Sequence, residues 1–187
     1  MSAVFYSIFV LSSKTHGLTG MKLLYLVRHA KSSWSNLSLD DFDRPLNKRG
    51  KRDAPMMAKR MLSQGIAPSL LLSSPAKRAM KTCKVFAKEL DYSKQRIETD
   101  MGLYHASSQE ILNIIRGKND ALDSIMVFGH NPGFTDLSNA LTGENILNVP
   151  TCGIVAVNFS VASWSDLAYE EGQLIFFDYP KRLENVV

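Results

Sequence analysis

Three short apolar runs constrain the fold of this chain more than any other feature. They are residues 23–27, 69–73 and 124–128. Runs of roughly four to eight mainly apolar residues are typical of strands buried on both faces, as in a parallel sheet. Longer segments with apolar residues at helical spacing separate them. Alternation of strand and helix predicts helices on both faces of a mostly parallel sheet, and we expect a three-layer α/β/α sandwich.

The positions of the remaining helices and strands are predicted from hydrophobic periodicity, from capping residues and from glycines that end helices. Helices are expected at residues 47–64, 75–90, 107–117 and 132–143. Further strands are expected near residues 96–99, 153–160 and 173–178. The last two are interpreted as a closing pair that adds an antiparallel edge to the sheet.

The length of 187 residues suits one domain with a sizeable core. Residues 4–11 are apolar but too short to span a bilayer, and no positive charge precedes them as in an export signal. We therefore interpret residues 1–20 as an extension, from an upstream start or from cloning, and residues 21–187 as the domain. No membrane association is expected.

Charge and cysteine content narrow the class of protein further. The net charge of +4 is mild and the basic residues are dispersed, so nucleic acid is not expected as a partner, whereas an anionic substrate is favoured. Two cysteines are too few for a disulfide framework and indicate a reducing, cytoplasmic location. The chain lacks a phosphate-binding glycine loop, a dinucleotide-binding turn and zinc-binding spacings. We expect neither a cofactor nor a metal.

The residues that follow the apolar runs carry the candidate chemistry. Arg28 and His29 follow the first run, and His130 follows the third. Arg78 lies in the first turn of a helix expected to start at Pro75, where free backbone N–H groups favour an anion. Ligands of open α/β sheets bind beyond the carboxyl ends of the strands. The sequence therefore predicts two imidazoles and two guanidiniums at one edge of the sheet.

These groups suit the transfer of a phosphoryl group. A neutral imidazole can attack phosphorus and form a covalent intermediate, which splits one difficult displacement into two easier ones. Nearby guanidiniums keep the imidazole neutral by repelling its proton, and they hold the phosphoryl oxygens. This chemistry requires no metal ion.

Four stretches resemble motifs of the histidine phosphatase superfamily, which has the phosphoglycerate-mutase-like fold, and of its SixA-type branch of phosphohistidine phosphatases. They are RHAKSSW at residues 28–34, DRPL at 43–46, SSPAKRA at 73–79 and GHNPG at 129–133. The resemblance implies that His29 is the nucleophile and that Arg28 and Arg78 clamp the phosphate oxygens. It also implies that His130 completes the pocket, whereas DRPL is expected to be a structural turn.

The resemblance assigns other positions less directly. Ser32 or Ser35 is expected to line the pocket. Most of the superfamily has glycine after the nucleophile, where this chain has Ala30. Many members also place a carboxylate after the Arg78 helix as the general acid, and Asp100 is the candidate here. A weak or absent acid favours an imidazole leaving group over an alkoxide, because imidazole has a pKa near neutrality.

The expected function is therefore metal-independent hydrolysis of phosphohistidine on a protein, in the cytoplasm. A chain of this length leaves little room for a cap over the pocket, and an open site would admit a protein side chain. Two alternatives stay open: a small phosphomonoesterase or mutase acting on sugar phosphates or nucleotides, and a phosphate-binding module without turnover. His16 and His105 are expected to be surface residues without a role, and nothing in the sequence indicates an oligomeric state.

Overall fold

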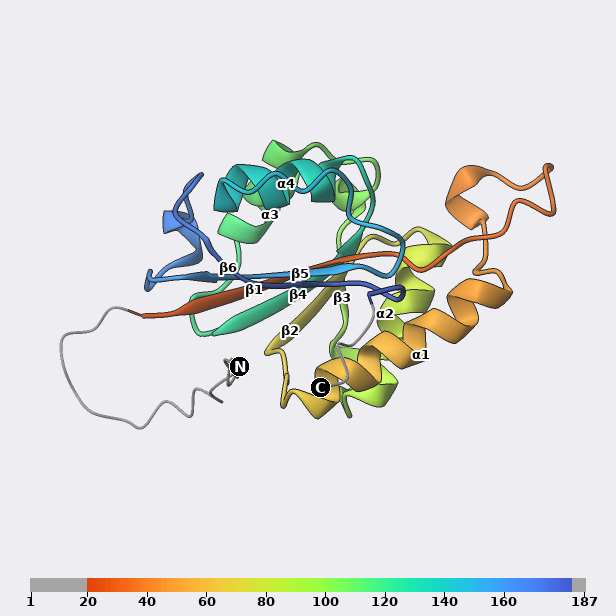
Figure 1. Cartoon of the computed structure of the whole chain (residues 1–187), viewed down its shortest axis with the longest axis horizontal. Coiled ribbons are helices and arrows are strands. Elements are labelled where there is room, and N and C mark those ends of the chain that lie inside the picture. Colours follow the sequence, from red (N-terminus) through yellow and green to blue (C-terminus); the bar gives the residue numbers. More distant parts are fainter. Residues whose placement is uncertain (1–19, 183–187) are drawn as a thin grey trace, which may run out of the picture.

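The computed structural model describes residues 20–182 and contains a six-stranded sheet in the order β3-β2-β4-β1-β5-β6 (Figure 1). The strands are β1 (Lys22–Arg28), β2 (Leu70–Ser73), β3 (Glu98–Thr99), β4 (Ser124–Gly129), β5 (Ile154–Phe159) and β6 (Gln173–Asp178). Strands β1 to β4 are parallel, whereas β5 and β6 join antiparallel at one edge. The predicted antiparallel edge is confirmed. Apart from Gly20, the extension expected at residues 1–20 lies outside the described residues.

Four helices form the two outer layers (Figure 1). They are α1 (Lys48–Ser63), α2 (Lys77–Glu89), α3 (Ser108–Arg116) and α4 (Gly133–Thr142). Helices α1 and α2 cover one face of the sheet, and α3 and α4 cover the other. Short 3₁₀ helices also occur; η1 (Asp41–Asp43) lies between β1 and α1, and η3 (Met101–Leu103) lies between β3 and α3. The α/β sandwich expected from the sequence is confirmed.

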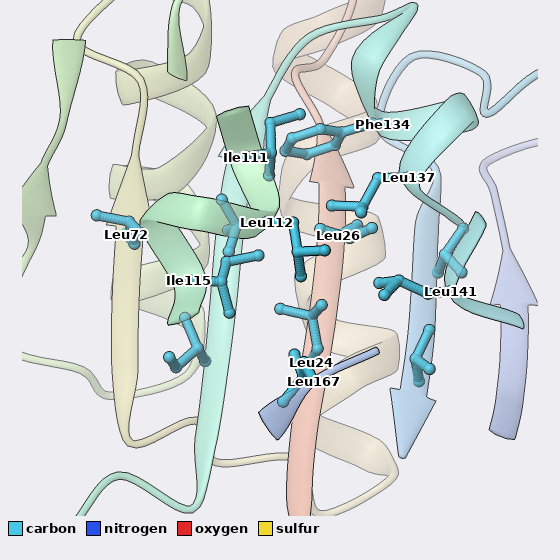
Figure 2. Packing of buried hydrophobic residues seen from close by; sticks show 14 of the residues in the cluster. Leu24, Leu26, Leu72, Ile111, Leu112, Ile115, Phe134, Leu137, Leu141 and Leu167 are labelled. Carbon is cyan, nitrogen blue, oxygen red and sulfur yellow. The ribbon is translucent and has the colours of Figure 1, made fainter. Parts of the chain in front are cut away.

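Strand β1 shows why the apolar runs do not alternate with polar residues. Leu24 and Leu26 belong to the core beneath α3 and α4 (Figure 2). Tyr25 and Val27 belong to the core beneath α1 and α2. Successive side chains of a strand point to opposite faces, so a strand covered on both sides buries all the residues along its middle, here 24–27.

Helix α2 begins two residues later than the proline at position 75 suggests. The backbone N–H of Ser74 still donates to Phe128 O, 2.9 Å away, so the hydrogen bonding of the sheet continues past the end of β2. Ala76 is the N-cap residue of α2, and its backbone angles, φ of −53° and ψ of 133°, are not helical. Arg78 nevertheless stays in the first turn of the helix.

Close backbone packing brings the loop after β4 onto the loop before α3. A Cβ at Gly133 would lie 2.1 Å from the carbonyl oxygen of Ala106, so only glycine permits this approach. The contact places the residue that follows β4 beside the residues that follow η3. Within residues 20–182, no helix is both long and apolar enough to cross a bilayer.

Candidate active site

The carboxyl ends of β1 and β4 bring the two predicted histidines together. The strands are parallel neighbours, and Arg28 pairs with Gly129, so the residues that follow them lie side by side. The ring centroids of His29 and His130 are 5.1 Å apart, and the residues are 8% and 5% exposed. The sheet register therefore positions both imidazoles.

Helix α2 brings Arg78 to the same place. Its Nε donates to Nε2 of His29 at 3.2 Å, and its side chain is buried. The other guanidinium nitrogens reach Asp41: Nη1 donates to the backbone oxygen, and Nη2 pairs with Oδ2 at 2.8 Å. Arg78 thus joins the imidazole of His29 to the η1 turn.

Arg28 completes the group from the end of β1. Its Nη1 donates to Val149 O at 2.8 Å and to Asn148 Oδ1 at 3.3 Å. Its Nε is buried and has no hydrogen-bond partner among the described residues. The charge of Arg28 contributes to lowering the pKa of His29, although less than burial and Arg78 do.

The local hydrogen bonding of His29 defines which nitrogen can react. Nδ1 lies 2.8 Å from Ala30 O, and a carbonyl oxygen only accepts, so Nδ1 carries the proton. Nε2 is then unprotonated, and its lone pair accepts the N–H of Arg78 Nε. Burial, followed by the charges of Arg78, Arg28 and Arg44, lowers the pKa of His29 to about 3 against an opposing backbone hydrogen bond. The imidazole is therefore neutral and nucleophilic at neutral pH.

His130 has one satisfied and one unsatisfied nitrogen. Its Nε2 lies 2.9 Å from Ser74 Oγ, which also accepts from the backbone N–H of Ala76. Its Nδ1 is buried and has no partner in the described part of the chain. Burial, the nearby His29 and Arg78 lower the pKa of His130 to about 2. Buried polar atoms without partners are rare in folded proteins, so the orphaned Nδ1 indicates a site for a polar ligand.

Three further residues lie around this site: Asp41, Tyr104 and His105. No sequence feature predicted the first two. The Tyr104 hydroxyl donates to Asp41 Oδ2 at 2.9 Å, and His105 Nε2 lies 3.4 Å from the same oxygen. The ring of His105 also stacks toward that of His130, with centroids 6.0 Å apart. His105 is a surface residue, as expected, with its side chain 60% exposed and a positive φ of 57°, and it also contacts Asp41 and His130. No periodicity or motif marks Asp41 or Tyr104, because both lie in irregular segments.

The remaining predicted site residues lie around this group without joining it. Ser32 Oγ accepts from Arg44 Nη2 at 2.7 Å, and Ser35 is exposed and bonded to Ser33. The carboxylate of Asp100 accepts from Gly102 N at 2.8 Å and so caps its own turn. No described contact links Asp100 to the two histidines or to Arg78.

The two buried imidazoles are predicted to destabilise the fold in acid. The pKa of an unfolded histidine is roughly 6.5, whereas that of His29 in the fold is about 3. Between these values the unfolded chain binds a proton that the folded chain refuses. The free energy of unfolding therefore falls as pH drops below 6.5, by at most about 1.4 kcal/mol per pH unit for each group.

Urea unfolding at about pH 7 and about pH 5 measures this loss. The His29→Gln variant cannot take up the proton, so its stability is expected to change less between the two conditions than that of the wild type. The same loss in both proteins would contradict the assignment of His29 as a neutral, buried imidazole.

Comparison with known proteins agrees with this geometry. Residues 24–126 match the model of the histidine phosphatase superfamily (branch 1). An uncharacterised chloroplastic protein of Arabidopsis thaliana is 33% identical over 151 residues, which cover 76% of this chain and 69% of that protein.

Solved structures extend the comparison to the fold. A crystal structure assigned to the phosphohistidine phosphatase SixA of Agrobacterium tumefaciens is 28% identical, has a TM-score of 0.72, and covers 85% of this chain and 98% of its own. The protein histidine phosphatase SixA complexed with tungstate shares the fold, with a TM-score of 0.74 at 21% identity, and covers 87% of this chain and 99% of its own.

The family match includes Arg28 and His29 at the end of β1 and Arg78 in α2, and it ends within β4, before His130. Together with the structural similarity, it supports a phosphatase activity on a phosphorylated substrate. The chain belongs to the histidine phosphatase superfamily and is similar to its SixA-type phosphohistidine phosphatases.

Proposed function

We propose that this protein hydrolyses phosphohistidine on a partner protein through a covalent intermediate on His29. The observation that carries the proposal is the unprotonated Nε2 of His29, which accepts a hydrogen bond from Arg78 Nε at 3.2 Å, in a site that also holds two buried nitrogens without partners among the described residues. Those nitrogens, Arg28 Nε and His130 Nδ1, need acceptors. A phosphoryl group supplies three oxygens to such donors and an electrophilic centre to the imidazole.

The reaction follows from the roles of these groups. His29 Nε2 forms a bond to phosphorus while the bond from phosphorus to the leaving nitrogen breaks and its electron pair stays on that nitrogen. Water then attacks the phosphorylated His29 and releases phosphate. Arg28 and Arg78 stabilise the charge on the transferring oxygens, which is the main source of catalysis in phosphoryl transfer.

His130 acts as a hydrogen-bond donor in this scheme. Ser74 Oγ accepts from Ala76 N, so its own hydrogen is available for His130 Nε2. The neutral ring then carries its proton on Nδ1, where a phosphoryl oxygen can accept it. The role assigned to His130 therefore needs no positive charge on the ring.

The surroundings of the site favour a phosphoramidate on a protein over a small phosphate ester. Asp100 caps its own turn, and the Asp41 carboxylate is held ionised by hydrogen bonds, so neither is placed to protonate an alkoxide. An imidazole leaving group needs less help. Between β3 and β4 the chain forms only η3 and α3, and Asp41 and His105 remain 36% and 60% exposed in their side chains. A histidine on a protein surface could reach them.

Turnover is predicted to survive removal of divalent cations. In this proposal the charge on the phosphoryl group is met by guanidiniums, which supply the electrostatic stabilisation that a metal ion provides elsewhere. Activity is expected to stay within about twofold after dialysis against EDTA. Loss of activity in EDTA, restored by Mg²⁺ or Mn²⁺, would contradict the metal-independent scheme.

Single-turnover assays test the proposed substrate class. A protein carrying phosphohistidine, and separately an alkyl phosphate and a nucleotide, are mixed with excess enzyme, and the phosphoenzyme is quenched and counted. We expect the phosphoenzyme to form faster from phosphohistidine. Faster transfer from the phosphate ester would favour the phosphomonoesterase alternative. Binding of tungstate without any phosphoenzyme would favour a phosphate-binding module.

The proposed location is the cytoplasm. Cys83 and Cys152 are both free and buried, and burial raises the pKa of both thiols. Inert reduced thiols suit a reducing compartment. Fractionation of cells expressing the full chain tests this, and recovery of the protein in another compartment would overturn it.

A further inference from the structure

The guanidinium of Arg78 binds both the nucleophile, His29, and the carboxylate of Asp41. In arginine, Nε and one terminal nitrogen form the edge that binds two oxygens of a carboxylate or phosphate in parallel. On Arg78, Nε donates to His29 Nε2 at 3.2 Å and Nη2 donates to Asp41 Oδ2 at 2.8 Å. One guanidinium therefore joins the nucleophile to a carboxylate that no motif of the sequence predicted.

The carboxylate is held from both sides. Arg44 Nη1 donates to Oδ1 at 2.7 Å, and Tyr104 donates its hydroxyl to Oδ2 at 2.9 Å. Arg44 is buried and anchored in turn by Ser32 and by the ring of Trp34, whose centroid lies 3.2 Å from the guanidinium carbon. Burial acts to raise the pKa of Asp41, but the hydrogen bonds from Arg44, Tyr104 and Arg78 outweigh it and hold the pKa well below its ordinary value. Asp41 is an ionised acceptor.

A negative charge in this place opposes binding of a phosphoryl dianion, because like charges close together repel. It also opposes a leaving oxygen, which gains negative charge as its bond to phosphorus breaks. It favours a substrate ring that is protonated on the nitrogen without phosphorus, because that phosphoimidazolium is a cation with an N–H to donate and keeps part of its positive charge while the P–N bond breaks. The charge of Asp41 therefore discriminates between leaving groups.

Aromatic rings flank the carboxylate on the solvent side. The centroids of Tyr104 and His105 are 4.1 Å apart, and that of Tyr104 is 5.6 Å from that of His130. A planar substrate ring could lie against them while it contacts Asp41. The side chain of Asp41 is 36% exposed, so a ring that enters from solvent can reach its oxygens.

We propose that Asp41 sets the leaving-group specificity of the site, by accepting the N–H of the phosphorylated substrate ring and stabilising its protonated form, from which neutral imidazole departs. This inference rests on the proposed function. The substrate ring carries phosphorus on one nitrogen and a proton from solvent on the other. As His29 Nε2 bonds to phosphorus, the P–N pair returns to the ring, which leaves as neutral imidazole with its proton still directed at Asp41.

The Asp41→Asn variant tests this with three substrates: phosphoimidazole, its N-methylated phosphoimidazolium analogue and p-nitrophenyl phosphate. We expect kcat/KM for phosphoimidazole to fall at least about tenfold, the size of one lost charged hydrogen bond. The methylated ring has no N–H to donate, so its kcat/KM should fall less. The value for p-nitrophenyl phosphate should rise, because a charge that repels the dianion is gone.

The pH profile provides a second measurement. The carboxylate raises the pKa of the bound substrate ring, so the rate with phosphoimidazole declines only at higher pH, where the ring loses its proton. In Asp41→Asn this decline should move to lower pH. The methylated substrate cannot lose a ring proton and should show no such shift. Asp41→Glu, which keeps the charge, should restore part of the preference for phosphoimidazole.

Asp43→Asn is the matched control, since Asp43 is exposed on the same short helix and loses the same charge. It should leave the ratio of phosphoimidazole to p-nitrophenyl phosphate activity within about twofold, the scatter usual for surface changes. If Asp41→Asn slows all three substrates equally and leaves the pH profile unchanged, the residue is only structural and the inference fails. If the wild type accepts a phosphoryl group neither from phosphoimidazole nor from a protein that carries phosphohistidine, the proposed function itself fails.

Discussion

Replacing His29 with alanine is expected to abolish turnover, with a loss of about a thousandfold or more, as for other enzymes that lose their nucleophile. The reason is that His29 Nε2, beside Arg78, is the proposed nucleophile. Without it, no nitrogen of the protein is available to attack phosphorus in the covalent step. Brief incubation with labelled substrate, followed by a denaturing quench, should give a phosphoenzyme in the wild type that is lost in acid and stable in base. The variant should give none.

Two controls separate this from a folding defect. The variant loses a buried neutral ring, so its urea unfolding at neutral pH should show a native baseline and a cooperative transition. Added free imidazole should restore part of the turnover, because it supplies a nucleophilic nitrogen to the cavity that the substitution leaves. Wild-type turnover in the folded variant without imidazole would refute a covalent mechanism through His29.

Replacing Arg78 with alanine is expected to lower kcat/KM by about 10²- to 10³-fold, or roughly 3–4 kcal/mol of transition-state stabilisation. The guanidinium is buried, donates to His29 Nε2 and holds the η1 turn through Asp41. Its loss removes both a charge on the phosphoryl oxygens and the positioning of the nucleophile. Steady-state kinetics with a phosphohistidine-bearing protein gives the magnitude.

Lysine at the same position should recover only part of the loss. Its single ammonium carries the charge but cannot bridge His29 and Asp41 in a fixed planar geometry. Lys77→Ala is the matched control, because Lys77 is the exposed neighbour on the same helix. It should change kcat/KM less than about threefold. An Arg78→Ala enzyme that stays within that range of the wild type would exclude Arg78 from the phosphate site.

The parts of the fold that repeat a simple pattern were predictable. Apolar runs located β1, β2 and β4, and the glycine expected to end the last helix lies at Gly143, in the left-handed conformation with φ of 69°. Arg28, His29 and His130 could be placed because each lies at or just after the end of a buried strand, and parallel strands end at one edge. Arg78 could be placed because helix starts have recognisable residues, even though α2 begins two residues later than expected.

The same reasoning could not find the second half of the site. Asp41 lies in a 3₁₀ turn within a long polar loop, and Tyr104 and His105 follow another such turn. These segments have no periodicity to relate sequence to space. His105 was expected to have no role because neither its neighbours nor its spacing distinguish it from an exposed loop histidine.

The sequence by itself therefore determined the sheet, its helical layers and the group of imidazoles and guanidiniums at the strand ends. These features could be predicted because burial on two faces and the direction of a strand show in the local sequence. Only the tertiary structure decided that the carboxylate of Asp41 lies on the same guanidinium edge as His29. Residues 41, 78 and 104 are far apart in the chain, and their meeting depends on how two irregular loops pack over the end of the sheet. Contacts of that kind leave no local signature, because the free energy that selects them comes from pairing a buried charge with partners in distant segments.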